Sequence, residues 1–246
     1  MGTRSPNQED GETRVPRSGD VTLFAGAPAR LEGRVRAWAA AGSVPEGAAI
    51  KEGEAYRVDS LFVKLFRDGK HRFFLRPSKA RRAAHLHAKL SWVPVPAPLC
   101  LLDLRRALPS GVRGVLVTRF IDGQTLGEVR RNPDALLRLA ELLARMHERG
   151  LHHGDLHPGN LIWDRERWWL LDLDGIRPPS HRLLGKRASL RQWGRLLLNL
   201  DREAALLLDP FHHYVSLRPS LGEAAPLWNE LPRIADEVEA RRKRRR

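Results

Sequence analysis

The residues best suited to chemistry stand close together in the middle of the chain, within LHHGDLHPGNLIWDRERWWLLDLDG at positions 151–175. Acidic, amide and imidazole side chains alternate there with short apolar runs, although such groups are costly to bury unless they are paired or bind a metal. Asn160 and Asp172 stand at the outer ends of two strand-like runs, NLIW and WWLLDLD, and the intervening DRER predicts one β-hairpin. Because the two outer ends of a hairpin meet, oxygen atoms of Asn160 and Asp172 could bind the same Mg²⁺.

Asp155 completes a set of residues that suits phosphoryl transfer. That reaction needs a carboxylate that positions the attacking hydroxyl group and accepts its proton, Mg²⁺ on the phosphates, and a cation that orients them. The segment HGDLHPGN (153–160) matches the kinase catalytic loop H-R-D-L-x-x-x-N except at its second position, where Gly154 replaces Arg. Lys64 is the one charged residue inside the apolar run LFVKLF and is the candidate cation. The pattern therefore predicts a phosphotransfer centre that uses ATP and Mg²⁺.

These motifs resemble those of the lipopolysaccharide core kinases of the Kdo kinase and WaaP type, and more distantly those of RIO-like atypical kinases and aminoglycoside phosphotransferases. The resemblance rests on MHERGLHHGDLHPGNLIW and WWLLDLDG and covers the chain between about Lys64 and Leu200. It implies an α+β, two-lobed protein-kinase-like fold with a strand-rich N-lobe and a helix-rich C-lobe. It further implies that ATP and Mg²⁺ are the cofactors and that the phosphate acceptor is a hydroxyl group of a core sugar, Kdo or heptose, or of a related glycolipid.

The resemblance also implies roles for single residues. Asp155 would be the catalytic base, and Asn160 and Asp172 would be the metal ligands. Lys64 would anchor the phosphates of the nucleotide. The hinge that would hold adenine through its backbone groups comprises Thr118, Arg119, Phe120 and Ile121.

The sequence departs from the kinase pattern at three places. The helix-forming segment SKARRAAHLHAKL (78–90) contains no Glu or Asp that could pair with Lys64. The segment PEGAAIKEGEAYRV (45–58) is not the G-x-G-x-x-G loop that covers phosphates in protein kinases. Gly154 removes the cation that would bind a phosphorylated activation loop, and no A-P-E follows. These departures favour a small-molecule or glycolipid kinase over a regulated protein kinase.

Three alternatives remain open on the sequence alone. The first is a small RIO-like protein kinase or ATPase, for which a basic tail would also suit. The second is a nucleotide-binding pseudokinase, because the Glu after Lys64 is missing and the glycine loop is sparse. The third is a zinc or iron site made by His152, His153 and His157 with Asp155. Pro158 disfavours this site because it breaks the strand that would align the ligands.

Composition and charge indicate a cytoplasmic protein. The 246 residues are 42% hydrophobic, no apolar run approaches the roughly 18 residues of a membrane span, and Cys100 is the single cysteine. The first 20 residues lack the apolar core of a signal peptide. The net charge is +14, and RRKRRR at 241–246 predicts a disordered tail that contacts a polyanion. We expect peripheral contact with the anionic inner face of the inner membrane, and we regard nucleic acid as the less suitable partner.

The residue pattern divides the chain into four parts: a disordered N-terminal tail (1–20), the N-lobe (21–118), the C-lobe with the catalytic loop (119–240) and the basic tail (241–246). Ser60–Asp68 and His71–Pro77 flank a turn signal and predict a β-hairpin, and VPVPAP (93–98) excludes helix. We expect His147 and His153 to be buried and hydrogen-bonded. Helices are expected at 78–92, between Asn132 and Gly150, at 187–208 and at 227–240.

Overall fold

The chain divides into two compact units of mixed helix and strand content. The computed structural model describes residues 20–67, 79–90, 92–173, 176–177 and 183–244. The first unit comprises Met1–Arg81 and Pro98–Thr118, and the second comprises Arg82–Ala97 and Arg119–Arg246. The expected α+β, two-lobed class is thus confirmed. Residues 82–97, which the sequence pattern placed in the N-lobe, group with the second unit, and the expectations for residues 1–19 and 71–77 lie outside the described residues.

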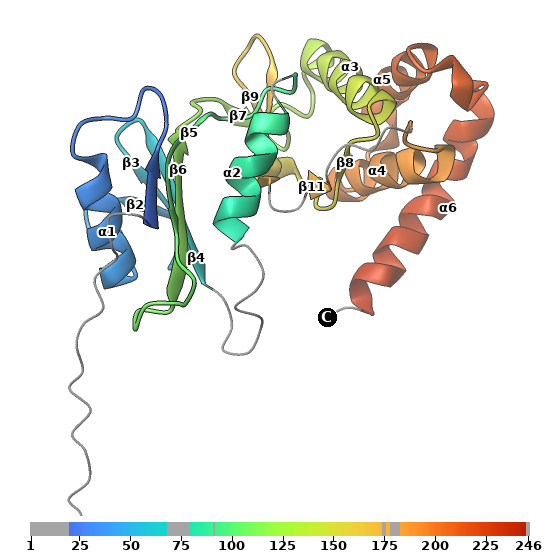
Figure 1. Cartoon of the computed structure of the whole chain (residues 1–246). Coiled ribbons are helices and arrows are strands. Elements are labelled where there is room, and N and C mark those ends of the chain that lie inside the picture. The colour runs from blue at the N-terminus through green and yellow to red at the C-terminus, as the bar shows by residue number, and fades with distance from the viewer. Residues whose placement is uncertain (1–19, 68–78, 91, 174–175, 178–182, 245–246) are drawn as a thin grey trace, which may run out of the picture. The chain divides into compact units, whose positions relative to one another are not determined.

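The first unit is built on a six-stranded sheet of order β1-β5-β6-β4-β3-β2. Its strands are β1 (Val21–Leu23), β2 (Ala48–Lys51), β3 (Ala55–Val58), β4 (Leu61–Arg67), β5 (Pro98–Asp103) and β6 (Val112–Arg119). Helix α1 (Leu31–Ala41) covers one face of the sheet (Figure 1). Its Trp38 and Val35 pack in one buried cluster with Val63 of β4. Because side chains alternate along a strand, Lys64 points to the face opposite Val63.

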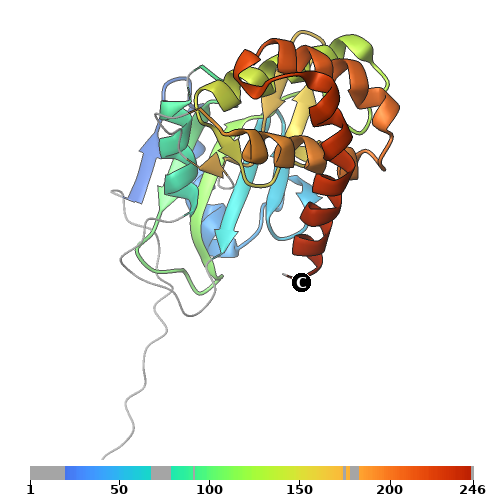
Figure 2. The same cartoon turned by 90° about the vertical axis from the view of Figure 1, so that its right-hand side faces the viewer.

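The second unit is mostly helical and carries two small sheets. Its helices are α2 (Lys79–Lys89), α3 (Pro133–Glu148), α4 (Lys186–Asn199), α5 (Ala204–Ser216) and α6 (Ala224–Lys243), and its short 3-10 turns are η2 (Pro158–Asn160) and η4 (Pro219–Leu221). The first turn of α2, up to Arg81, belongs to the first unit. The sheets are β10-β9-β7 and β11-β8, made by β7 (Gln124–Thr125), β8 (His152–His153), β9 (Leu161–Trp163), β10 (Trp168–Leu170) and β11 (Ile176–Arg177). Helix α3 packs on α5 and α4 packs on α6, and Figure 2 shows α6 passing α4.

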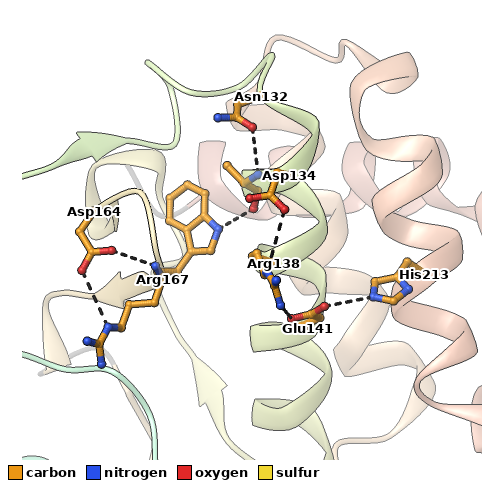
Figure 3. A network of polar contacts seen from close by, with 9 residues as sticks. Asn132, Asp134, Arg138, Glu141, Asp164, Arg167 and His213 are labelled. Atoms are coloured by element: carbon orange, nitrogen blue, oxygen red, sulfur yellow. Dashed lines mark hydrogen bonds and ion pairs between the residues drawn. The ribbon is translucent and has the colours of Figure 1, made fainter.

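Helix α3 begins and ends as its flanking residues predict. The Asn132 side chain accepts a hydrogen bond from the Ala135 N–H at 3.1 Å, which is an N-cap, and Gly150 adopts a left-handed φ of 66° just after the last turn. The Trp168 Nε1 atom of the hairpin donates to the Ala135 carbonyl at 2.6 Å. Figure 3 shows this first turn of α3 beside the hairpin turn, where Asp164 accepts a hydrogen bond from the backbone N–H group of Arg167. Asp164 also accepts one from the N–H group of Glu166. The hairpin is therefore fixed to α3.

The helix expected at 187–208 is wrong as a single element. Helix α4 ends at Asn199 and α5 begins at Ala204. Asp201 and Arg202 between them have φ values of 54° and 61°. A left-handed backbone cannot continue a right-handed helix, so these two residues separate α4 from α5.

The basic tail is also more ordered than expected, because α6 extends to Lys243. Repulsion among neighbouring cations favours disorder, but Lys243 forms an ion pair of 2.9 Å with Glu239 one turn earlier, and α6 packs along α4. Arg241 and Arg242 therefore belong to a helix. None of the helices within the described ranges has the length and apolar character that crossing a membrane requires.

Candidate active site

The catalytic loop follows the short strand β8 and is held by its own hydrogen bonds. The Asn160 Nδ2 atom donates to the Asp155 carbonyl at 2.9 Å, and the His157 Nδ1 atom accepts from the Gly159 N–H at 3.1 Å. Leu156 is buried and anchors the loop, whereas the Asp155 carboxylate is exposed. The loop thus presents one carboxylate to solvent on a backbone that is fixed on both sides.

The hairpin brings Asn160 and Asp172 together, as expected. Leu161 of β9 pairs with Leu170 of β10, and the Asn160 carbonyl accepts a hydrogen bond from the Leu171 N–H at 2.8 Å. Asp172 is the next residue and has a φ of 57°. This left-handed conformation is uncommon outside glycine, and among other residues it favours Asn and Asp. Asp172 therefore leaves the strand by a sharp turn beside Asn160.

His153 links the catalytic loop to the end of the hairpin. Its Nε2–H donates to the Leu171 carbonyl at 3.1 Å, and its Nδ1 accepts from the Asp155 N–H at 3.2 Å. Burial lowers the pKa of His153, which agrees with a neutral ring in this single tautomer. The expectation of a buried, hydrogen-bonded histidine is confirmed. Because both ring nitrogens are engaged, His153 cannot also bind a metal, and nowhere in the described ranges do three His, Cys, Asp or Glu side chains converge as metal ligands.

Helix α4 holds the loop from behind through residues that the sequence pattern did not single out. The Gln192 Nε2 atom donates to the His153 carbonyl at 2.8 Å, and the Asn199 Nδ2 atom donates to the Leu156 carbonyl at 3.1 Å. Arg195 donates to the His153 carbonyl at 3.3 Å and to the Gly154 carbonyl. The sequence does carry a signal for them, because these three polar residues recur at helical spacing on one face of a Leu-rich helix.

The first unit carries the candidate phosphate anchor and the start of the candidate hinge. Lys64 is half-buried in β4, and its Nζ atom lies 5.2 Å from the centre of the Phe66 ring. Arg81, near the position where kinases place a Glu, forms a 3.6 Å ion pair with Asp103. The hinge begins at Thr118 and Arg119 in β6 and continues with Phe120 and Ile121.

A pocket of about 760 Å³ lies beside the catalytic loop within the second unit. The loop contributes Asp155 and His157 to it. The remaining wall combines apolar side chains with arginines from α4 and α6 and with Glu237 of α6. An acceptor molecule in this pocket would lie against the Asp155 carboxylate.

Comparisons with known proteins identify the family and the fold of the chain. No curated protein sequence matches the chain. A solved structure described as WaaP in complex with acyl carrier protein shares the fold, with a TM-score of 0.55 and 20% identity over 89% of this chain and 98% of that chain. The sequence model of the lipopolysaccharide kinase (Kdo/WaaP) family matches residues 30–205, which is most of the chain. The protein therefore belongs to the lipopolysaccharide kinase (Kdo/WaaP) family and is a phosphotransferase that acts on a sugar hydroxyl group.

Proposed function

We propose that this chain transfers the γ-phosphoryl group of ATP, with Mg²⁺, to a hydroxyl group of Kdo or heptose in the lipopolysaccharide core. The observation that carries the proposal is the hydrogen-bonded link from Asp155 through His153 to Leu171, beside Asp172. This link holds a candidate base and a candidate metal ligand on one rigid frame. Phosphoryl transfer depends mainly on such positioning.

Asp155 would act as the base in this reaction. The acceptor oxygen forms a bond to the γ-phosphorus, the bond from that phosphorus to the bridging oxygen breaks, and ADP leaves. The proton of the acceptor hydroxyl group passes to the Asp155 carboxylate. An exposed carboxylate at the pocket suits this role, since the acceptor must reach it from solvent.

The residues at the hairpin end fit a magnesium ion. Mg²⁺ prefers oxygen ligands, and it would neutralise charge on the phosphates when bound. The Asn160 amide donates through Nδ2 to the loop, which leaves its Oδ1 for a metal. Asp172, which would supply a carboxylate, follows Leu171, whose N–H donates to the Asn160 carbonyl. This donor set supports Asn160 and Asp172 as the metal ligands.

Lys64 would anchor the nucleotide phosphates, and residues 118–121 would hold adenine. No acidic residue occurs in α2 (Lys79–Lys89), so the anchor would work without the usual helix glutamate. We expect Lys64→Ala to raise the KM for ATP by about tenfold through loss of a charge-assisted contact. Lys51→Ala, at an exposed position of β2, is the matched control and should leave that KM unchanged.

The decisive experiment is Mg²⁺-dependent ATP turnover by the full chain, with and without a lipopolysaccharide core glycolipid extract. Turnover that the extract stimulates, and that Asp155→Asn and Asp172→Ala abolish, would support the proposal. Turnover with a polypeptide acceptor, or without any acceptor, would favour the RIO-like alternative. Nucleotide binding without phosphate transfer, unaffected by Asp155→Asn, would favour a pseudokinase.

We also propose that the protein works at the cytoplasmic face of the inner membrane. The acceptor sugar is attached to a lipid, and the net charge of +14 suits an anionic surface. Sedimentation with anionic vesicles, compared with neutral vesicles, tests this location. Equal sedimentation with both would contradict it.

A further inference from the structure

We propose that Arg191, Arg241 and Arg242 form an anion-binding subsite in the acceptor pocket, so that the preferred acceptor carries a phosphate or carboxylate group near its reacting hydroxyl group. The inference rests on the proposed function, because it takes Asp155 as the base that the acceptor approaches. It adds a specificity element supplied by the C-terminal helix. That helix lies outside residues 30–205, the part of the chain matched by the family.

The placement of these arginines in the pocket is the first observation. The same pocket of about 760 Å³ is lined by Asp155 of the loop, by Arg191 of α4 and by Arg241 and Arg242 of α6. All of these elements belong to the second unit. A ligand that reaches Asp155 therefore shares one pocket with these three guanidinium groups from two helices. Arg195 of α4 also lines the pocket, but it donates to the carbonyls of His153 and Gly154.

One acidic side chain of the pocket wall, Glu237, attracts Arg191 and Arg241 electrostatically but forms its ion pairs with other arginines. Glu237, also at the pocket wall, is engaged by Arg187 at 3.4 Å and by Arg233. In the described part of the chain, Arg191, Arg241 and Arg242 form no ion pair with an acidic side chain. The acids on this part of α6 are thus used by other cations, and the pocket keeps an excess of positive charge.

The electrostatics of Arg191 agree with this excess. Its pKa is lowered, first by partial burial and then by the nearby positive charges of Arg241 and Arg187, with Glu237 opposing the shift. Cations that lie close together repel one another, and a bound anion would relieve that repulsion. Guanidinium groups also match phosphate and carboxylate oxygens in pairs, which makes arginine the usual residue for such recognition.

The packing of α6 on α4 explains why the arginines hold this position. A Cβ atom added to Gly194 of α4 would lie 3.3 Å from the Ala235 backbone nitrogen of α6, so the absence of a side chain lets the two helices approach closely. A 2.8 Å ion pair between Arg202 and Asp236 holds the same region of α6. Two turns further along, α6 presents Arg241 and Arg242 at the pocket.

The test compares two double variants of the full chain that remove equal charge from the same helix end. Arg241→Gln with Arg242→Gln changes the pocket wall, whereas Lys243→Gln with Arg244→Gln changes residues outside it. With the core glycolipid as acceptor, we expect the first variant to raise the acceptor KM by about tenfold or more, with the KM for ATP unchanged. The second should change the acceptor KM less than about twofold. Equal effects would indicate general attraction to an anionic surface and would overturn the subsite.

Modified acceptors show whether the recognised anion is a phosphate or a carboxylate group. Phosphatase-treated glycolipid and glycolipid with its carboxylates reduced are assayed beside the untreated material. The acceptor that lacks the recognised group should be used poorly by the wild-type chain and equally poorly by the Arg241→Gln, Arg242→Gln variant. If the variant and the wild type differ by the same factor on all three acceptors, no anion is recognised and the subsite is refuted.

A binding measurement separates failure of the subsite from failure of the proposed function. Inorganic pyrophosphate is titrated calorimetrically into the chain with its nucleotide site saturated by Mg²⁺ and a non-hydrolysable ATP analogue. Binding that Arg191→Gln or the Arg241→Gln, Arg242→Gln change weakens by about tenfold would support the subsite even if no kinase turnover is found. Binding that all variants retain, or no binding to the wild type, would overturn it whether or not the chain is a kinase.

Discussion

The Nε2–H of His153 donates a 3.1 Å hydrogen bond to the carbonyl of Leu171, and this bond ties the catalytic loop to the hairpin end that carries Asp172. The same ring accepts the Asp155 N–H through Nδ1. One buried imidazole therefore spans the backbone on both sides of the proposed phosphotransfer centre. We propose that its role is to position these residues.

Replacing His153 should remove the link between the catalytic loop and the hairpin end that carries Asp172. We expect His153→Ala to lower kcat by about 100-fold, since a small misplacement of reacting groups has that effect. The loss of a buried, doubly hydrogen-bonded side chain should also lower the unfolding free energy by about 2 kcal/mol. Steady-state kinetics and urea unfolding measure the two effects. His85→Ala at an exposed position of α2 is the control, and a normal kcat for His153→Ala would contradict the positioning role.

Two substitutions of Asp172 should separate its backbone role from its charge. Asn tolerates the left-handed φ of 57°, so Asp172→Asn should keep the melting temperature while losing most activity through loss of the carboxylate. Asp172→Ala should lose activity similarly and lower the unfolding free energy by about 1 kcal/mol more, because alanine is strained in this conformation. Calorimetry beside the turnover assay tests both. Equal stability of the two variants would show that the backbone conformation costs little.

Loss of the hydrogen bonds from α4 to the loop should lower kcat but leave the KM for ATP unchanged. Asn199→Ala removes the donor to the Leu156 carbonyl. We expect kcat to fall about tenfold and the unfolding free energy by about 1 kcal/mol, with the KM for ATP unchanged. Leu208→Ala, at an exposed position of α5, is the control. A change in the KM for ATP with constant kcat would contradict this role for α4.

The stability of the second unit should fall as the pH is lowered through about 6.5. Burial, then Arg218 and His152, hold the pKa of His147 well below its ordinary value of 6.5. Burial likewise lowers the pKa of His153. Below pH 6.5 these histidines bind protons in the unfolded chain but stay neutral in the folded chain. The free energy of unfolding therefore decreases as the pH falls below 6.5, and it does not change through these groups above that pH.

Urea unfolding between pH 8 and pH 5 measures this dependence. The His147 Nδ1 atom and the Tyr214 hydroxyl group share a hydrogen bond of 2.8 Å, and a glutamine amide, which can both donate and accept, could take its place. His147→Gln should therefore reduce the loss between pH 7 and pH 5 by at least about 1 kcal/mol. His85→Gln should not change it. A loss that is the same in wild type and His147→Gln would exclude His147 as its source.

The sequence alone was sufficient where local rules decide the structure. The hairpin around Asp164, the N-cap at Asn132 and the end of α3 near Gly150 follow from turn, capping and left-handed preferences of single residues. The loop pattern also identified Asp155, Asn160 and Asp172 as candidate site residues, because all three lie in one short segment of the chain. The resemblance to the lipopolysaccharide kinases and the expected phosphotransfer chemistry came from that same segment, which lies within the family match at residues 30–205.

Only the tertiary structure decided what surrounds this segment. Trp193 of α4 is buried, but Gln192 and Asn199 of the same helix bind loop carbonyls that lie 39 and 43 residues away in sequence. The tail that self-repulsion predicts to be disordered is helical through Lys243 because α6 packs on α4. Local preference cannot specify such contacts, since they depend on which helices meet and at which residues. The position of Arg241 and Arg242 beside Asp155 is therefore a property of the folded chain.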